Sequence, residues 1–425
     1  MSLIIKNGRV LNPPTGTDAI CDIKIDGNRI SAVEAGIVPV FSDEVIDAKG
    51  CFVFPGLIDL HVHFRDPGQT AKEDIESGSR AAAHGGFTTV VAMPNTKPVA
   101  DNTDVIDYVH DKAKKVGLTR VLQVGSITKD MAGKELSDIE GMAKAGIPAL
   151  SEDGKSVMDS GLYRKAMKLA KEYKLPVLAH CEDINLVEGG VMNAGAKAST
   201  LGEKGITNAV ENVIEARDAM LAQETGARLH LCHCSTAESY DIIKESKAQG
   251  VDISGEVCPH HFTLTEEDIV AGDGNYKMNP PIRTKEDRAK LLQGLAEGVF
   301  EVISTDHAPH TAEEKAKGFG SPFGIVGLET SAALTYTELV MKGVITPFTM
   351  AAYMSSNPAR VLGREDIGDL SVGKAADVTI FDPNAEYDID ANEFVGKSKN
   401  MPYQGRHVHG RVLYTIFGGE IVYKY

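Results

Sequence analysis

Hydrophobic and polar positions follow one pattern at both ends of the chain and another pattern between them. Over the first fifty residues, short alternating segments such as LIIKNGRVL and CDIKIDGNRISAV are separated by Asn-Gly and Asp-Gly pairs. The last sixty residues repeat this alternation in ADVTIFDP and HVHGRVLYTIFGGEIVYKY. Alternation with period two, interrupted by such turn pairs, is typical of β-hairpins. Both ends of the chain are therefore predicted to be rich in β-structure.

Between about Phe54 and Gly363, short apolar runs alternate with amphipathic stretches. The apolar runs are FPGLIDLHVHF, FTTVVAMPN, TRVLQVGSI, IPALSED, PVLAHCED, RLHLCHCS, VDISGEVCPHH and FEVISTDHAPH. The helix candidates between them include residues 73–84, 159–173, 209–225, 237–249 and 286–297. Such alternation indicates parallel β-α units. Eight of these units favour an α/β fold of the closed (β/α)8, or TIM-type, barrel kind.

Composition and net charge argue against some classes of binding partner. The chain has 425 residues, of which 42% are hydrophobic and 24% charged, as is ordinary for a globular α/β protein. The formal net charge of −16 argues against a nucleic acid or an anionic membrane as partner, because both require a local excess of Lys and Arg. The six cysteines lack C-x-x-C spacing, which favours reduced thiols. Since neither a secretory signal nor an apolar run of ~18 residues is evident in the sequence, we expect a cytoplasmic protein.

Several apolar runs end on residues that can bind metal ions. These residues are His61, His63, Asp153, His180, His233 and Asp306. Side chains at positions i and i+2 of a strand point to the same face, so His61 and His63 are expected to point together into the barrel mouth. The active sites of such barrels lie at the C-terminal ends of the strands. Because this set exceeds what one tetrahedral zinc ion needs, it predicts two ions bridged by a carboxylate.

The other histidines and two of the cysteines receive a structural interpretation. Isolated histidines without a metal-binding pattern are His84, His110, His407 and His409. His260 and His261 of CPHH are interpreted as packing or supporting residues. Cys232 and Cys234 are interpreted as small buried hydrophobes that face away from His233 on a strand.

Seven motifs give the chain a resemblance to a known family. They are DLHVHFRDPG, AMPNT, SEDG, LAHCED, HLCHCS, KMNPPIR and STDHAPHTAEEK, which extend from Asp59 to Lys315. Together they resemble the motifs of the bacterial class I dihydroorotases, of the amidohydrolase superfamily. In that family a composite β-sandwich accompanies the barrel. The resemblance covers essentially the whole chain, and it implies a sandwich built from residues 1–53 and 364–425 beside a catalytic barrel of residues 54–363.

The same resemblance implies two Zn²⁺ ions per subunit. His61, His63 and Asp306 would bind one ion, His180 and His233 would bind the other, and Asp153 would bridge the two. Many relatives use a carboxylated lysine as the bridge; Lys155 lies two residues beyond Asp153 and is interpreted instead as a solvated or helix-start lysine. Glu152 stands where the motif more often has Asp, which leaves the bridging position intact.

The reaction implied is the reversible cyclisation of N-carbamoyl-L-aspartate to L-dihydroorotate with loss of water, the third step of de novo pyrimidine synthesis. In the hydrolytic direction, a hydroxide between the two ions attacks the ring amide, and Asp306 is the general acid and base. The planar guanidinium of Arg65 matches the free carboxylate of this substrate. The substrate-binding residues implied by the resemblance are His63, Arg65, Asn95, Asn279, His310, Phe323 and Gly324. For Asn279, a role in the turn before Pro280 is an equally good interpretation.

Other functions and properties stay open at this stage. One alternative is another cyclic amidase, such as a hydantoinase, dihydropyrimidinase or allantoinase, although Arg65, Asn95 and His310 favour a substrate with a carboxylate. A second is an inactive homologue that serves as a scaffold for aspartate transcarbamoylase, against which the complete ligand set argues. The glycine-rich segment 318–327 fits either a mobile lid or a plain surface loop. We expect a homodimer, while association of an active enzyme with aspartate transcarbamoylase, the metal used and its occupancy are left undecided.

Overall fold

Eight parallel strands form a closed barrel in the computed structural model, which describes residues 2–425. In chain order these strands are β6 (Leu57–Val62), β7 (Phe87–Ala92), β8 (Arg120–Gln123) with its continuation β9 (Gly125–Ser126), β10 (Leu150–Ser151), β11 (Val177–Ala179), β14 (Leu229–Leu231), β15 (Ile253–Val257) and β16 (Val302–Ile303). β8 pairs with β7, and β9 pairs with β10. The barrel closes where Val62 forms a parallel bridge to His307, and the N–H of His63 donates to the carbonyl of His307 at 2.8 Å. The predicted (β/α)8 barrel is confirmed.

Helices surround the barrel at the positions that the sequence pattern predicts. The five predicted helices are α1 (Ile75–His84), α4 (Ser160–Glu172), α6 (Ala209–Thr225), α7 (Ala237–Ala248) and α9 (Lys285–Glu297). The others are α2 (Thr103–Val116), α3 (Ile139–Lys144), α5 (Ala196–Leu201), α8 (Pro259–Thr263), α10 (Ala312–Lys315), α11 (Ser331–Thr335), α12 (Pro347–Ala351) and α13 (Asn357–Val361). Side-chain caps explain several of the starts: Asp74 accepts from the N–H of Ser77 before α1, and Thr284 accepts from the N–H of Asp287 before α9. Among residues 2–425, no helix is both long and apolar enough to cross a membrane.

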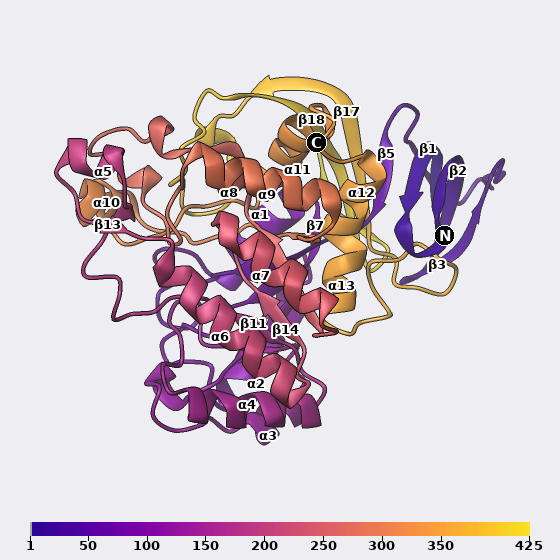
Figure 1. The fold of residues 1–425 in the computed structure, drawn as a ribbon. Helices are drawn as coiled ribbons and strands as arrows, with labels where there is room; N and C mark the ends of the chain where they lie inside the picture. Colours follow the sequence, from indigo (N-terminus) through magenta and orange to yellow (C-terminus); the bar gives the residue numbers. More distant parts are fainter. Residues whose placement is uncertain (1) are drawn as a thin grey trace.

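Strands from the two ends of the chain pair in one sheet at the side of the barrel (Figure 1). They are β1 (Leu3–Asn12), β2 (Thr17–Asp26), β3 (Arg29–Glu34), β4 (Glu44–Asp47), β5 (Phe52–Pro55), β17 (Val378–Asp388), β18 (His407–Phe417) and β19 (Glu420–Lys424). The junction is the antiparallel pair of β5 and β17, in which Val53 lies opposite Ile380. Apolar side chains from both ends share one core, which includes Ile5, Ile23 and Ile416. The β-rich ends are therefore confirmed, while the exact domain boundaries stay a prediction. A separate pair of short strands, β12 (Met192–Asn193) and β13 (Gly205–Ile206), lies in the loop after β11.

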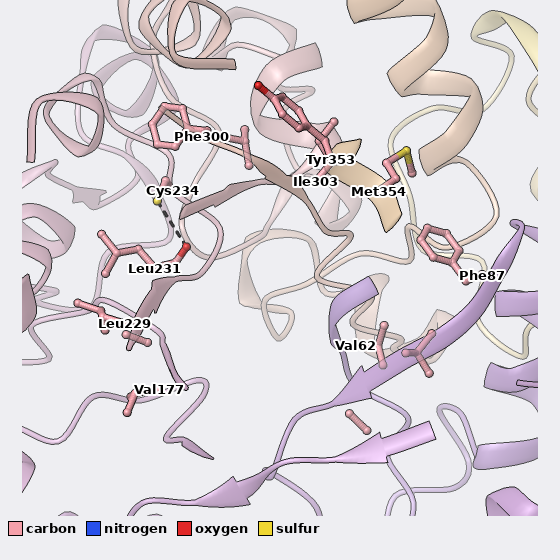
Figure 2. Close-up of a cluster of buried hydrophobic side chains, with 14 of the residues drawn as sticks. Val62, Phe87, Val177, Leu229, Leu231, Cys234, Phe300, Ile303, Tyr353 and Met354 are labelled. Atoms are coloured by element: carbon pink, nitrogen blue, oxygen red, sulfur yellow. Dashed lines mark hydrogen bonds between the residues drawn. The ribbon is translucent and has the colours of Figure 1, made fainter. Parts of the chain in front are cut away.

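The alternation of side chains along β14 separates an inner from an outer core. Leu229, Leu231 and Cys234 pack in the layer between strands and helices (Figure 2), whereas Cys232 lies with Leu60 inside the barrel. The two cysteines beside His233 are thus buried, as predicted, but they do not share a face. The reason is the left-handed backbone of His233, with φ of 37°, which interrupts the regular alternation. All six cysteines are free thiols.

Candidate metal centre and substrate cleft

The six predicted metal ligands converge at the mouth of the barrel, and all six are buried. His61 is on β6 and His63 just beyond it, while Asp153, His180, His233 and Asp306 come one to three residues after β10, β11, β14 and β16. Asp153 lies among the imidazoles: its Oδ1 is 3.1 Å from His61 Nε2 and 3.2 Å from His180 Nδ1, and its Oδ2 is 3.4 Å from His63 Nε2. The sequence thus identified residues from five strand ends that meet at one point.

The donor atoms form two overlapping groups, each of which is narrow enough for one cation. His61, His63 and Asp306 make one group, and His61, Asp153 and His233 make the other, with donor atoms within 4.8 Å of one another in each. His180 adjoins the second group, since its Nδ1 is 2.8 Å from His233 Nε2. In the part of the chain that the structure describes, His61 Nε2 and Asp153 Oδ1 have no hydrogen-bond partner. A buried polar atom left in this state costs about 1–3 kcal/mol, so these atoms fit a bound ion, and imidazole and carboxylate donors suit zinc.

The charges in this centre compensate one another. Burial acts to lower the pKa of His61, but the charges of Asp153 and Asp306 outweigh burial and raise this pKa well above its ordinary value. Burial acts to raise the pKa of Asp153, but the charge of His61 and the nearby rings of His180 and His233 hold it well below its ordinary value. The ionised carboxylates among these imidazole rings are therefore balanced by positive charge, which is carried either by protons on the histidines or by divalent cations.

Two glutamates behind the centre were not identified from the sequence. Glu256 Oε1 on β15 accepts from His61 Nδ1 at 3.1 Å, and its Oε2 accepts from His230 Nε2 at 3.0 Å. Glu182 Oε2 is 3.2 Å from His180 Nε2. Carboxylates in such places fix which ring nitrogen of a histidine faces the metal. One signal was present, because Glu256 is an acidic residue in the middle of the apolar run VDISGEVCPHH.

The predicted substrate-binding residues share one cleft with the metal ligands. This cleft encloses about 310 Å³, at the small end of the range for small-molecule sites. It is lined by His63, Arg65, Asn95, Asn279, His310, Phe323 and Gly324, and by Gln69 and Lys72, which the sequence did not indicate. Asn279 does contribute to the cleft, and its Nδ2 donates to Glu182 Oε1 at 3.0 Å.

One end of the cleft is positively charged. Arg65 Nη2 lies 3.5 Å from His310 Nε2. Burial lowers the pKa of Arg65 to about 10, so that the guanidinium remains charged at neutral pH. Burial, together with the charges of Arg65, Lys72 and Lys315, lowers the pKa of His310 to about 3, so that this imidazole is neutral. A cationic fork beside neutral donors is suited to a carboxylate.

Three side chains of the cleft are held by a left-handed backbone. The φ angles are 59° at Arg65, 37° at His233 and 49° at Asp306. For residues other than glycine this conformation costs about 1–3 kcal/mol each and is concentrated at functional sites. The strain coincides with the residues that bear the predicted chemistry, since all three line the cleft.

The glycine-rich segment 318–327 forms one wall of the cleft. Lys277 Nζ donates to the carbonyl of Phe319 at 2.7 Å, and Lys315 Nζ donates to the carbonyl of Pro322 at 3.1 Å. Gly324 has φ of 122° and closely approaches Ala308, where a Cβ would come within 2.5 Å. Its conformation therefore requires glycine. Motion of this wall as a lid stays a prediction.

The (β/α)8 barrel with a buried centre of histidines and aspartates at its mouth defines an amidohydrolase, a class that is generally metal-dependent. Solved structures with a similar fold include an L-hydantoinase (dihydropyrimidinase) from Arthrobacter aurescens, with a TM-score of 0.90 and 26% identity, covering 99% of this chain and 96% of that one. A D-hydantoinase from Thermus sp. has a TM-score of 0.85 and 27% identity, covering 99% and 94%.

Similarity over the whole sequence selects one branch of this class. A dihydroorotase from Clostridioides difficile (strain 630) is 46% identical over 423 residues, covering 99% of this chain and 100% of that protein. A dihydroorotase from Aquifex aeolicus (strain VF5) is 45% identical over 425 residues, covering 100% of both. A profile described as Dihydro-orotase-like matches residues 50–239. The chain belongs to the dihydroorotase family.

Proposed function

We propose that this chain is a zinc-dependent dihydroorotase that catalyses the reversible cyclisation of N-carbamoyl-L-aspartate to L-dihydroorotate. The observation that carries the proposal is the presence, in one cleft, of the His/Asp centre and the cationic end at which Arg65 lies beside the neutral His310. The first can activate water against an amide, and the second can hold a carboxylate. Dihydroorotate presents both groups on one small ring.

His61, His63 and Asp306 would hold one Zn²⁺ ion, His180 and His233 would hold the other, and Asp153 would bridge them. When bound, two such ions lower the pKa of a shared water towards neutrality and polarise the scissile carbonyl. The protein prepares its ligands for this role. Because His61 Nδ1 donates to Glu256, its Nε2 lone pair is directed into the centre.

Asp306 would move the proton. The charges of His61 and His63 overcome the effect of burial and keep the pKa of Asp306 below its ordinary value, so that the carboxylate is ready to accept. In hydrolysis it takes the proton of the attacking water and returns it to the departing ring nitrogen. In synthesis the same carboxylate would take the proton of the ureido nitrogen that closes the ring and pass it to the side-chain carboxylate oxygen that departs as hydroxide.

Arg65, Asn95 and His310 would hold the substrate carboxylate. His63 Nδ1 donates to Asn95 Oδ1 at 2.9 Å, which leaves the amide nitrogen of Asn95 to donate into the cleft. Arg65 supplies the paired donors that match a carboxylate. Asn279, Phe323 and Gly324, which line the same cleft, would contact the ring through side-chain and backbone groups.

The proposal extends to assembly and location. We infer a homodimer in the cytoplasm that binds no nucleic acid, in agreement with the free thiols and the net charge of −16. Association with aspartate transcarbamoylase would be tested by co-purification. A composite sandwich of residues 1–53 and 364–425 beside the barrel is proposed as the domain division.

The deciding experiment is hydrolysis of L-dihydroorotate by zinc-loaded protein, run beside hydantoin, dihydrouracil and allantoin at one enzyme concentration, with metal content measured on the same sample. We expect a clear preference for dihydroorotate. A preference for a neutral ring would reject Arg65 as the specificity residue and favour another cyclic amidase. Bound zinc without turnover of any substrate would favour the scaffold function.

A further inference from the structure

Lys72 lies at the cationic end of the cleft, in the segment between β6 and α1. Its Nζ is 3.3 Å from His310 Nδ1 and 2.9 Å from Glu314 Oε1. The backbone around it is tied down, because the carbonyl of Lys72 accepts from Ser398 Oγ at 2.7 Å and its N–H donates to Gln69. The side chain is only 18% exposed. Lys72 is therefore placed to act on His310 from the side away from Arg65.

The contacts of His310 determine which ring nitrogen carries its hydrogen. His310 Nε2 is 2.7 Å from the carbonyl oxygen of Phe323, and a carbonyl oxygen only accepts. His310 Nδ1 faces the ammonium group of Lys72, which only donates. Both contacts are satisfied by a neutral ring with its hydrogen on Nε2. Arg65 Nη2 also only donates, but at 3.5 Å it lies farther from Nε2 than the carbonyl oxygen of Phe323 does. That ring is neutral because burial and the neighbouring cations hold the pKa of His310 at about 3.

Glu314 would favour the other tautomer of His310 if the negative charge of its carboxylate were not neutralised. Its Oε2 is 3.3 Å from the same Nδ1 and accepts from the N–H of Thr311 at 3.2 Å. A carboxylate beside Nδ1 favours a hydrogen on that atom, which would leave two acceptors, Nε2 and the carbonyl of Phe323, facing each other. The ion pair with Lys72 cancels the charge of Glu314 and supplies the donor that Nδ1 needs.

We propose that Lys72 is a positioning residue for the carboxylate end of the cleft. It fixes His310 as the tautomer with its hydrogen on Nε2, which the carbonyl of Phe323 and a bound substrate carboxylate would share, and it prevents Glu314 from repelling an anionic substrate. The kinetic consequence rests on the proposed function, whereas the tautomer of His310 does not.

The test compares Lys72→Met with wild type in the zinc-loaded enzyme. We expect KM for dihydroorotate to rise about tenfold, which corresponds to about 1.4 kcal/mol, while kcat changes by less than about twofold, because Lys72 does not reach the metal ligands. Lys72→Arg should restore much of the affinity, since it keeps the charge. Lys72→Met combined with Glu314→Gln should also recover affinity, because the unpaired carboxylate is gone.

Long-range ¹H–¹⁵N spectra report the tautomer directly, with His310→Gln identifying the signal. The hydrogen should be on Nε2 in wild type and move to Nδ1, or onto both nitrogens, in Lys72→Met. The matched control is the exposed pair of Lys144 and Glu140 on α3, whose atoms are 2.6 Å apart; Lys144→Met should alter neither KM nor the spectrum.

An unchanged KM together with an unchanged His310 signal in Lys72→Met would overturn the proposal. So would a parallel fall in kcat, kcat/KM and melting temperature, because that pattern indicates a general structural role. If wild type fails to hydrolyse dihydroorotate, the proposed function is wrong, and the spectra of the same proteins still decide the role of Lys72.

Discussion

Replacing Glu256 by glutamine tests whether a carboxylate that is not itself a predicted ligand orients the histidines of the metal centre. Glu256 is fully buried and accepts three hydrogen bonds, from His61 Nδ1 at 3.1 Å, from His230 Nε2 at 3.0 Å and from the N–H of His233 at 3.2 Å. Burial acts to raise the pKa of Glu256, but the hydrogen bonds from His230 and His61 lower it far below its ordinary value, so the group is a carboxylate. Glutamine keeps its size and removes its charge.

The size of the effect follows from these contacts. A hydrogen bond to a charged group contributes about 1.5–3 kcal/mol. The introduced amide would keep one acceptor oxygen but turn an NH₂ group towards a ring N–H of His61 or His230, so one imidazole must rotate or exchange its tautomer. Loss of such an orienting partner weakens metal binding by about 10- to 100-fold, or about 1.4 to 2.7 kcal/mol. We expect this loss for Glu256→Gln.

The assay is zinc affinity measured by chelator competition, which does not depend on turnover. Glu215→Gln on α6 is the matched control, because Glu215 is equally buried and no hydrogen bond joins it to a predicted metal ligand within residues 2–425. The control should bind zinc as wild type does. Equal zinc affinities for Glu256→Gln and Glu215→Gln would refute the reasoning that Glu256 orients the ligands.

Further substitutions probe other parts of the molecule. Asp306→Asn should lose nearly all turnover while retaining its melting temperature within a few degrees, because one carboxylate serves as ligand and proton shuttle; steady-state rates near those of wild type would contradict that role. Arg65→Lys should raise KM about tenfold with a smaller change in kcat, since an ammonium does not reproduce a paired contact, and an equal KM would reject the clamp. Burial, followed by the charge of Glu211, raises the pKa of Glu215 well above its ordinary value. The folded protein therefore keeps the carboxyl proton of Glu215 to a higher pH than the unfolded chain does. Stability should therefore fall as the pH rises above the unfolded pKa, by up to about 1.4 kcal/mol per pH unit, and Glu215→Gln should remove this slope in urea titrations between pH 5 and 9; parallel profiles would count against it.

The sequence predicts most of the framework because the relevant signals are local. Helix α6 begins and ends at the predicted residues, 209 and 225. The end of α6 follows from Gly226, whose left-handed backbone caps the helix, a signal that acts within one turn of chain. The HxH pair His61 and His63 was likewise visible from two positions separated by one residue at the end of one strand.

The partners of these ligands were not visible, since they depend on contacts across the barrel. His61 and Glu256 are separated by 195 residues, and His310 and Lys72 by 238. Which residue of a distant strand or loop comes within hydrogen-bonding distance is set by the closure and register of the whole barrel. The opposite directions of Cys232 and Cys234 just after β14 have a similar origin, because the strained backbone of His233 is maintained by its tertiary surroundings.

The sequence by itself therefore determined the eight β-α units, the β-rich ends and the residue types at the strand ends, because periodicity and motif spacing are properties of short segments. Only the tertiary structure decided that Glu256, Glu182 and Lys72 support this site. Their roles are defined by distances and by burial, which convert ordinary glutamates and a lysine into groups that fix the tautomers and charges of histidines. Neither quantity exists until the barrel has closed.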